Sequence, residues 1–320
     1  MRCVAAVAAF LAFWPGLLLA QEDAGLDPDT PPAVVRTGPA SDDRLTIPIR
    51  IGVQGTWNFV IDTGAQRTVI SRDLAQRLAL VEARRVTILS MTGRSDVGSV
   101  DLPPIAFGTT TIKDIEAPVL DGDHLGAPGL LGLDGLQSKR LLLNFRTGRM
   151  EISASNRRVR PESDAIIVEA RRRNGQLILL DSTVEGSRVN IILDTGTNIS
   201  VGNMALLAKL TKKGRAPATT PASLTSVTGG VLIGQIAILR TVKMGGATLV
   251  DLPVLFAEAS PFEELDLHDR PALLLGINAL KVFDRVAIDF GRGKVDFMIP
   301  DQGSLAGAQL ADARGGVDMP

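Results

Sequence analysis

The strongest constraint on this chain is an internal repeat built around the triplet Asp-Thr-Gly. The triplet occurs at residues 62–64 and again at 194–196. Residues 45–61 and 176–193 each predict a β-hairpin that runs directly into its triplet, because two strand-like segments are joined at a Gly-containing turn in both. Repetition on this scale predicts two related halves with equivalent folds.

The parallel between the halves extends beyond the triplets. A short strand and a helical segment follow each one, at residues 68–78 and 199–209, and Ser71 stands where an N-cap belongs in the first. Further along, an apolar pair runs into Gly132 in the first half and into Gly276 in the second, and a hairpin then closes each half. The motifs follow the same order in both halves, but the distance from each triplet to the later glycine differs, so the halves are alike but are not copies.

The composition favours β-structure. With 32 Gly, 18 Pro and few long helical runs the chain has many turns, and 45% hydrophobic residues suffice for a real core. We therefore predict an all-β fold with short helices, in which two pseudo-symmetric, β-barrel-like lobes surround a central cleft. The predicted segments are a signal peptide (1–20), a flexible N-terminal segment (21–43), an N-terminal lobe (44–153), a linker (154–164), a C-terminal lobe (165–300) and a flexible tail (301–320).

The first residues are typical of a secretory signal. Arg2 gives a positive start, residues 4–20 are apolar, and cleavage is predicted after Ala20. An uncleaved membrane anchor is the alternative, but the apolar run is short for a span and contains Pro15. The only cysteine, Cys3, lies within this segment, which excludes disulfides and cysteine nucleophiles from the predicted mature chain. We expect an exported bacterial protein, periplasmic or secreted, without stable membrane insertion after cleavage.

The paired triplets indicate carboxylate chemistry. A single Asp-Thr-Gly often marks only a turn, but if two halves pack about an approximate twofold axis, Asp62 and Asp194 meet at that axis. Two carboxylates that close share a proton, because both cannot ionise cheaply. The pair then offers a base and an acid to a water that attacks an amide carbonyl. Such hydrolysis requires no metal and no cofactor, and we predict neither.

These motifs resemble those of the aspartic protease superfamily, specifically of bacterial retropepsin-like proteins in a duplicated, single-chain form. The resemblance covers about residues 45–300 and rests on residues 59–65 and 191–197, with the later glycines inside 130–134 and 274–278. It implies the two-lobed acid protease fold, an extended polypeptide as substrate, and a monomer that holds both half-sites. Asp62 and Asp194 take the catalytic role.

The resemblance also implies roles for the neighbouring residues. Thr63 and Thr195 would each hydrogen-bond to the opposite loop and hold the two turns together, while Gly64 and Gly196 let the backbone approach the carboxylates. In this family the strand that ends at the later glycine packs against the catalytic loop.

The position after each triplet differs between the halves. Thr197 could hydrogen-bond the carboxylate of Asp194, whereas Ala65 has no hydroxyl to offer Asp62, so the two acids need not titrate alike. Two Thr-Gly turns lie where a substrate-covering flap could arise, and the sequence does not indicate which of the two forms it. The flap candidates are Thr92, Gly93, Thr228 and Gly229.

Other functions fit the sequence less well. A duplicated fold that has lost turnover would be a catalytically silent periplasmic protein that binds extended peptides by backbone pairing. Two-carboxylate glycosidases seldom take their acids from identical turns of a repeat. His124 and His268 stand in acidic loops and are interpreted as solvated side chains rather than metal ligands. A net charge of −1 without a large basic block argues against nucleic-acid binding.

Overall fold

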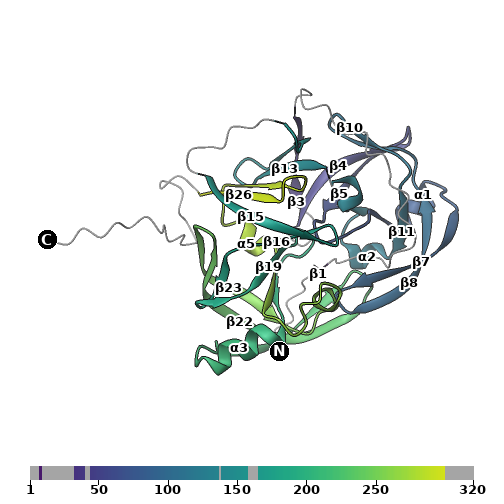
Figure 1. Cartoon of the computed structure of the whole chain (residues 1–320). Helices are drawn as coiled ribbons and strands as arrows, with labels where there is room; N and C mark the ends of the chain where they lie inside the picture. The colour runs from purple at the N-terminus through teal and green to yellow at the C-terminus, as the bar shows by residue number, and fades with distance from the viewer. Residues whose placement is uncertain (1–6, 9–31, 40–43, 137, 158–164, 300–320) are drawn as a thin grey trace.

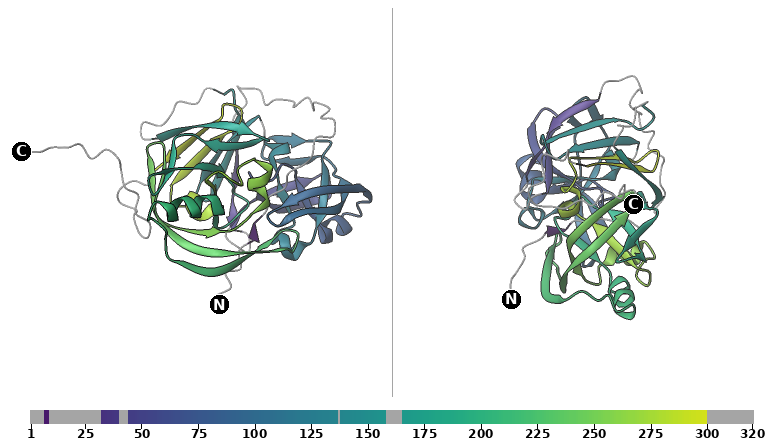
Figure 2. Two further views of the ribbon diagram at one scale, coloured as in Figure 1. Left: turned by 60° about the horizontal axis from the view of Figure 1, so that its bottom comes forward. Right: turned by 90° about the vertical axis from the view of Figure 1, so that its left-hand side faces the viewer.

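Two lobes built mainly of β-strands lie side by side in the computed structural model, which describes residues 7–8, 32–39, 44–136, 138–157 and 165–299 (Figure 1). The N-terminal half, purple to blue, forms one lobe, and most of the C-terminal half, green to yellow, forms the other; a second viewing direction shows the same division (Figure 2). The helices are few and short. This is the fold class predicted from the sequence.

The N-terminal lobe contains a sheet of ten strands within the described residues. Its main path runs β10-β9-β4-β5-β12-β6-β11-β8-β7, with β3 beside β4. The strands are β3 (Gly38–Pro39), β4 (Leu45–Ile51), β5 (Gly55–Ile61), β6 (Val69–Ser71), β7 (Glu82–Ser90), β8 (Gly93–Asp101), β9 (Ile105–Phe107), β10 (Thr110–Ile112), β11 (Glu116–Leu120) and β12 (Gly129–Leu131).

The C-terminal lobe repeats this arrangement. The strand order β19-β24-β20-β23-β22 corresponds to β5-β12-β6-β11-β8, and each pair keeps its direction: β24 is parallel to β19 and antiparallel to β20, as β12 is to β5 and β6. The repeat in sequence is therefore a repeat in topology. The strands are β15 (Ala165–Arg173), β16 (Gln176–Leu179), β17 (Ser182–Val184), β18 (Ser187–Arg188), β19 (Asn190–Leu193), β20 (Ser200–Gly202), β21 (Thr219–Ser226), β22 (Val231–Met244), β23 (Ala247–Phe256) and β24 (Ala272–Leu275).

The hairpins that close the two halves join the lobes. β13 (Lys139–Asn144) and β14 (Arg149–Ala154) form the first, β25 (Arg285–Asp289) and β26 (Lys294–Met298) the second, and β13 pairs antiparallel with β25. One hydrogen-bonded sheet therefore crosses the boundary between the halves, and one apolar cluster contains residues of both. This shared sheet fixes how the two lobes face each other.

The short helices occupy corresponding places in the two halves. Ser71 caps the first, since its Oγ accepts from Leu74 N at 3.2 Å, and Asn203 caps its counterpart by accepting from Leu206 N at 2.9 Å. The helices are α1 (Arg72–Arg77), α2 (Gly122–Leu125), the 3₁₀ turn η1 (Leu133–Gly135), α3 (Met204–Lys212), α4 (Ser260–Glu264) and α5 (Ile277–Leu280). Across the described part of the chain, no helix has the length and apolar character that a bilayer crossing demands.

The segment predicted to be flexible, residues 21–43, contains two strands. β2 (Ala33–Arg36) pairs with β14, and β3 pairs with β4. Ala33 and Val35 are buried while the residues between and after them are exposed. Pro and Thr residues stand directly before β2 and mask its alternation in the sequence, so residues 33–36 and 38–39 are β-strands within the segment predicted to be flexible.

Most of the predicted signal peptide lies outside the described residues. Within it the structure describes β1 (Val7–Ala8), which pairs in parallel with the edge of β21 at Thr225 and Ser226. Residues 158–164 of the predicted linker and all of the predicted tail, 301–320, also lie outside the described part of the chain.

Candidate active site

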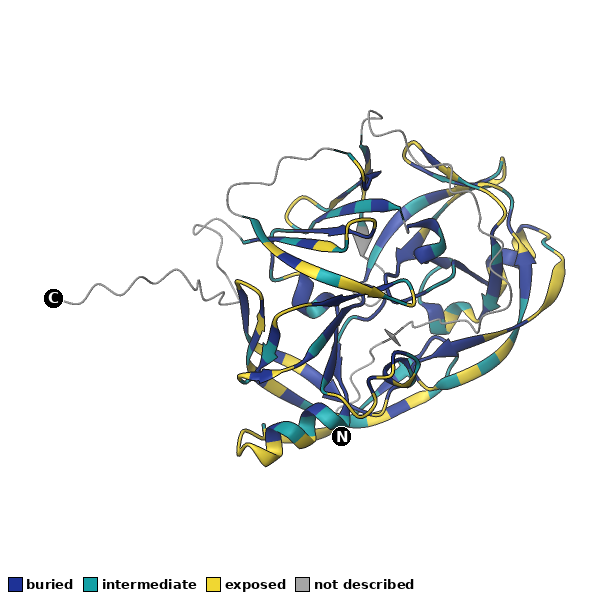
Figure 3. Cartoon of the chain, viewed as in Figure 1, coloured by how far each residue is buried: buried dark blue, intermediate teal, exposed yellow. Residues whose placement is uncertain are grey.

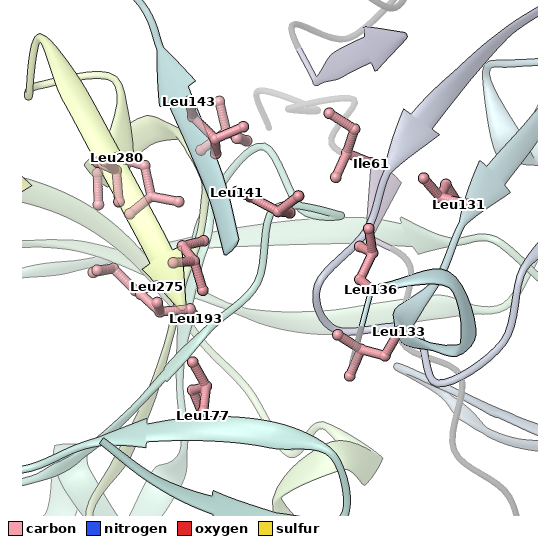
Figure 4. Packing of buried hydrophobic residues seen from close by; sticks show 14 of the residues in the cluster. Ile61, Leu131, Leu133, Leu136, Leu141, Leu143, Leu177, Leu193, Leu275 and Leu280 are labelled. Atoms are coloured by element: carbon pink, nitrogen blue, oxygen red, sulfur yellow. The ribbon is translucent and has the colours of Figure 1, made fainter. Parts of the chain in front are cut away.

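Each Asp-Thr-Gly loop is anchored by the strand that carries it and by that strand's parallel neighbour. Figure 3 shows buried residues, dark blue, along the strands in the interior of the chain. Ile61 pairs with Leu131 at the end of β5, and Leu193 pairs with Leu275 at the end of β19; all four side chains belong to the buried cluster (Figure 4). One residue further on, Asp62 N donates to Leu131 O at 3.0 Å, and Asp194 N donates to Leu275 O at 3.1 Å. The paired apolar strands thereby fix the backbone position of both aspartates.

A second pair of contacts supports the loops from behind. Thr68 N and Oγ1 both donate to the carboxylate of Asp134, at 2.8 and 2.7 Å, and Ser200 N and Oγ both donate to Asn278 Oδ1, at 2.9 and 2.8 Å. Both acceptors lie inside the glycine motifs, at residues 130–134 and 274–278, and no role was predicted for either. Their equal offset after Gly132 and Gly276 was the signal that could have found them.

The two loops are cross-linked by their threonines. Thr63 N donates to Thr195 Oγ1 at 3.0 Å, and Thr195 N donates to Thr63 Oγ1 at 3.1 Å. Each hydroxyl also donates to a carbonyl of the opposite lobe, Thr63 to Leu193 at 3.2 Å and Thr195 to Ile61 at 2.7 Å. These are the hydrogen bonds that the resemblance implied, and they hold the ends of β5 and β19 together.

Loss of one cross-linking hydroxyl should separate the loops. Thr195→Val keeps the shape but removes one acceptor and one donor, which leaves Thr63 N and Ile61 O unpaired in a buried place. We expect the free energy of unfolding to fall by about 1–3 kcal/mol. Urea denaturation measures this, and Thr195→Ser, which retains the hydroxyl, is the control and should stay near wild type.

The carboxylates of Asp62 and Asp194 meet between the lobes. Both side chains are fully buried, and the two carboxyls are close enough for each to affect the pKa of the other. The glycines make this approach possible: a Cβ built on Gly196 would lie 2.2 Å from Asp62 Cγ, and one on Gly64 would lie 2.7 Å from Asp194 Oδ1. Each carboxylate therefore packs on the backbone of the opposite loop, where a side chain would displace it.

The two aspartates differ in their backbone donors. Asp62 Oδ1 accepts from Gly64 N at 2.8 Å and from Ala65 N at 2.9 Å, whereas Asp194 Oδ1 accepts from Gly196 N alone at 2.9 Å among the described hydrogen bonds. Both Oδ2 atoms are buried without a donor from the described residues. One proton held between these oxygens would satisfy both.

Burial raises the pKa of both carboxyls. The pKa of Asp62 rises because burial disfavours its charge, and the Arg44 guanidinium and the N–H groups of Ala65 and Gly64 oppose this rise. The pKa of Asp194 rises well above its ordinary value through burial and through the negative charge of Asp62. The pair is therefore arranged to keep one proton where isolated carboxyls would have lost theirs.

The two aspartates differ in their hydrogen-bond donors, but not through the side chains of Ala65 and Thr197 as expected. Thr197 Oγ1 donates to Ile199 O at 2.9 Å instead of to Asp194, so the predicted hydroxyl contact is wrong. The hydroxyl is used within its own loop, on the backbone carbonyl two residues along. Ala65, which has no hydroxyl, contributes its backbone N–H to Asp62. Asp62 is thus the carboxylate that accepts more backbone hydrogen bonds.

Both predicted flap turns meet at one place. Thr92 and Gly93 turn β7 into β8, Thr228 and Gly229 turn β21 into β22, and Thr228 Oγ1 donates to Ser90 Oγ at 2.9 Å. A Cβ on Gly230 would lie 2.2 Å from Thr92 Oγ1. The turns therefore touch across the lobes, and the structure favours neither as the sole flap.

Each of these turns places an apolar residue in the core of the other lobe. Met91 is fully buried among residues of β19, β20 and β23, and its carbonyl accepts from Ser260 N at 3.1 Å. Val227 is fully buried among residues of β5, β6 and β12. Each turn is therefore packed into the opposite lobe through one apolar side chain.

The histidines are not gathered at the dyad. His124, on α2, lies against the turn at Gly229, where a Cβ would come within 2.6 Å of its ring, and His268 is exposed. In the described ranges, no three or more His, Cys, Asp or Glu side chains are grouped so that they could hold a metal ion.

Comparison with protein families agrees with this geometry. The family model for aspartyl proteases matches residues 47–134 and 180–279, which together make up more than half of the chain. The chain therefore belongs to the aspartyl protease family, and the match is to its retropepsin-like branch. The two matched segments follow the two halves of the repeat. No curated protein matches the chain significantly.

Proposed function

We propose that this protein is an aspartic endopeptidase that hydrolyses peptide bonds with a water activated between Asp62 and Asp194. One observation carries the proposal: two carboxyls from equivalent loops lie buried together, each against the backbone of the opposite loop, in a place that raises both pKa values. A pair that holds one proton can supply a base and an acid at once. Membership of the aspartyl protease family supports the same assignment.

The unequal donors suggest how the roles divide. Asp62 accepts two backbone N–H bonds, which stabilise its negative charge. Asp194 accepts one, and burial and the charge of Asp62 raise its pKa, so Asp194 is the carboxyl that keeps the proton. Asp62 takes a proton as the water oxygen bonds to the carbonyl carbon, and Asp194 gives its proton to the carbonyl oxygen. The proton on Asp62 then passes to the amide nitrogen, Asp194 recovers one from a hydroxyl, and the C–N bond breaks.

The proposed substrate is an extended polypeptide. The backbone edges of the flap hairpins would pair with it, as strands do in peptide recognition. We also propose that the protein is exported and acts as a monomer. The apolar start of the sequence supports export, and the presence of both half-sites in one chain supports the monomer.

Cleavage of unfolded protein tests the proposal. The full chain is incubated with a reduced, alkylated protein and with quenched-fluorescent peptides from pH 4 to 8, and fragments are identified by mass spectrometry. We expect internal cleavage by the wild type and none by the double variant Asp62→Asn/Asp194→Asn. Fragments that persist with the double variant would overturn the assignment.

A catalytically silent peptide-binding protein is the rival from another class. Both functions predict that unfolded peptides bind, so binding alone does not separate them. Tight binding by wild type without cleavage at any pH tested would favour the rival. Binding and cleavage together favour the peptidase.

A further inference from the structure

A buried arginine lies beside the dyad, and neither the repeat nor the proposed mechanism accounts for it. Arg44, at the start of β4, is fully buried. Its guanidinium donates from Nη1 to Gly196 O, at 3.5 Å, and from Nη2 to Leu125 O. Arg44 thus connects the first lobe to the loop that carries Asp194.

The second half has a neutral residue in the corresponding place. Arg44 and Gln176 stand equally far before Asp62 and Asp194. Gln176 Nε2 donates to Gly64 O at 2.9 Å, and Gln176 is also fully buried. Each half therefore holds the glycine of the opposite triplet through a side-chain N–H. An uncharged amide performs this task in one half, so the positive charge in the other half has a separate role.

Charge balance suggests that role. A dyad that holds one proton carries one negative charge, and burying a single charge is expensive unless an opposite charge lies near it. Arg44 is the cation that acts on both carboxyls, and it lowers the pKa of each against the effect of burial. Arginine suits such a place because its guanidinium stays charged and its flat fork can donate to two acceptors.

Within the described residues, the other charged side chains around Arg44 are placed differently. α2, which supplies the Leu125 carbonyl, also carries Asp123 and His124, but Asp123 is exposed and His124 lies against Gly229. Asp134, behind the first loop, accepts from Thr68. Among these described groups, Arg44 is the one whose full charge is buried next to the pair.

We propose that Arg44 is a positioning residue that holds the second loop through Gly196 and supplies the counter-charge of the singly protonated dyad. The inference deepens the proposed peptidase function, because a dyad that keeps exactly one proton at working pH is what that function requires. Arg44 touches no reacting atom in this scheme. It acts through the loop and through its charge.

Arg44→Gln tests the charge with little change in shape. The variant installs the residue that the second half already uses, so the hydrogen bond to Gly196 can persist. Removing the cation raises the pKa of the dyad, so the acidic limb of the profile of kcat/KM against pH should move upward by about 1 pH unit. Arg50→Gln is the matched control: Arg50 lies on β4, the strand that directly follows Arg44, is exposed, and donates to Gly52 O at 3.1 Å. Its profile should coincide with wild type.

A titration without turnover separates this inference from the proposed function. The aspartate carboxyl carbons are labelled with ¹³C, the dyad signals are assigned with Asp62→Asn and Asp194→Asn, and their midpoints are measured by NMR. Arg44→Gln should titrate at higher pH than wild type and than Arg50→Gln. Unchanged midpoints overturn the inference. Wild type that titrates as expected yet cleaves nothing would contradict the peptidase alone.

Arg44→Lys covers the case in which Arg44→Gln does not fold. Lysine keeps the charge but cannot reach two carbonyls with one planar group. We expect midpoints near wild type together with a lower kcat, because the loop is held less firmly. A lysine variant that matches wild type in both quantities would overturn the positioning role.

Discussion

Asp62→Asn and Asp194→Asn should each lower kcat by about a thousandfold or more while the fold is retained. Either change removes the base or the acid of the pair, and general acid–base catalysis contributes roughly 10²–10⁴ for each group. The amide is nearly the same size as the carboxyl and can still accept from the backbone N–H groups that hold each aspartate. Initial rates on a quenched peptide measure the loss.

The same variants should be more stable than wild type near neutral pH. Burial raises the pKa of both carboxyls above the ordinary 3.8, so the folded state binds protons more tightly than the unfolded chain. That contribution to stability is complete below pH 3.8 and is lost as the pH rises through the raised pKa values. The amides do not ionise, so their advantage over wild type should grow from pH 4 to pH 7. Urea denaturation at both pH values measures it.

Asp134→Asn is the matched control for both effects. Asp134 is half-buried and desolvation raises its pKa too, but it accepts from Thr68 and does not contact the dyad. Asn278 accepts from Ser200 in the equivalent place, which shows that an amide suits this position. We expect activity to survive in Asp134→Asn. A dyad variant that keeps wild-type turnover would remove the basis for the assignment.

The repeat in the sequence predicted most of what positions the dyad. The hairpins before Asp62 and Asp194 follow from local alternation, and their meeting follows from two equivalent halves about an axis. The threonine cross-links could be anticipated because Thr63 and Thr195 occupy corresponding positions of loops that meet. These features depend on pattern and symmetry, which a single sequence displays.

The features that were missed depend on the other lobe or on competition between neighbours. Met91 and Val227 are single apolar residues in polar turns, and nothing local indicates that each is buried by the opposite lobe. The Thr197 hydroxyl donates to the carbonyl of Ile199 rather than to the carboxylate that precedes it in the loop. Arg44 directly precedes a strand, where a charged residue is common, and only the fold brings its guanidinium beside Gly196.

Gly196→Ala should abolish activity and destabilise the fold more than any other single methyl addition at the site. The added Cβ would lie 2.2 Å from Asp62 Cγ and 2.3 Å from both its oxygens, closer than real Cβ atoms come to other groups. Asp62 cannot move away easily, because Gly64 N and Ala65 N hold its Oδ1. The clash must therefore separate the carboxyls or the loops.

Gly64→Ala places its Cβ 2.7 Å from Asp194 Oδ1, a milder overlap with a carboxylate held by one backbone donor. The order of damage should therefore be Gly196→Ala, then Gly64→Ala, in both peptide cleavage and urea midpoint. Gly122→Ala is the control, since its Cβ would meet nothing closer than 3.6 Å and its backbone needs no left-handed conformation. Equal tolerance of Ala at positions 196 and 122 would mean that the loops do not pack this closely, and the shared proton would then lose its geometric support.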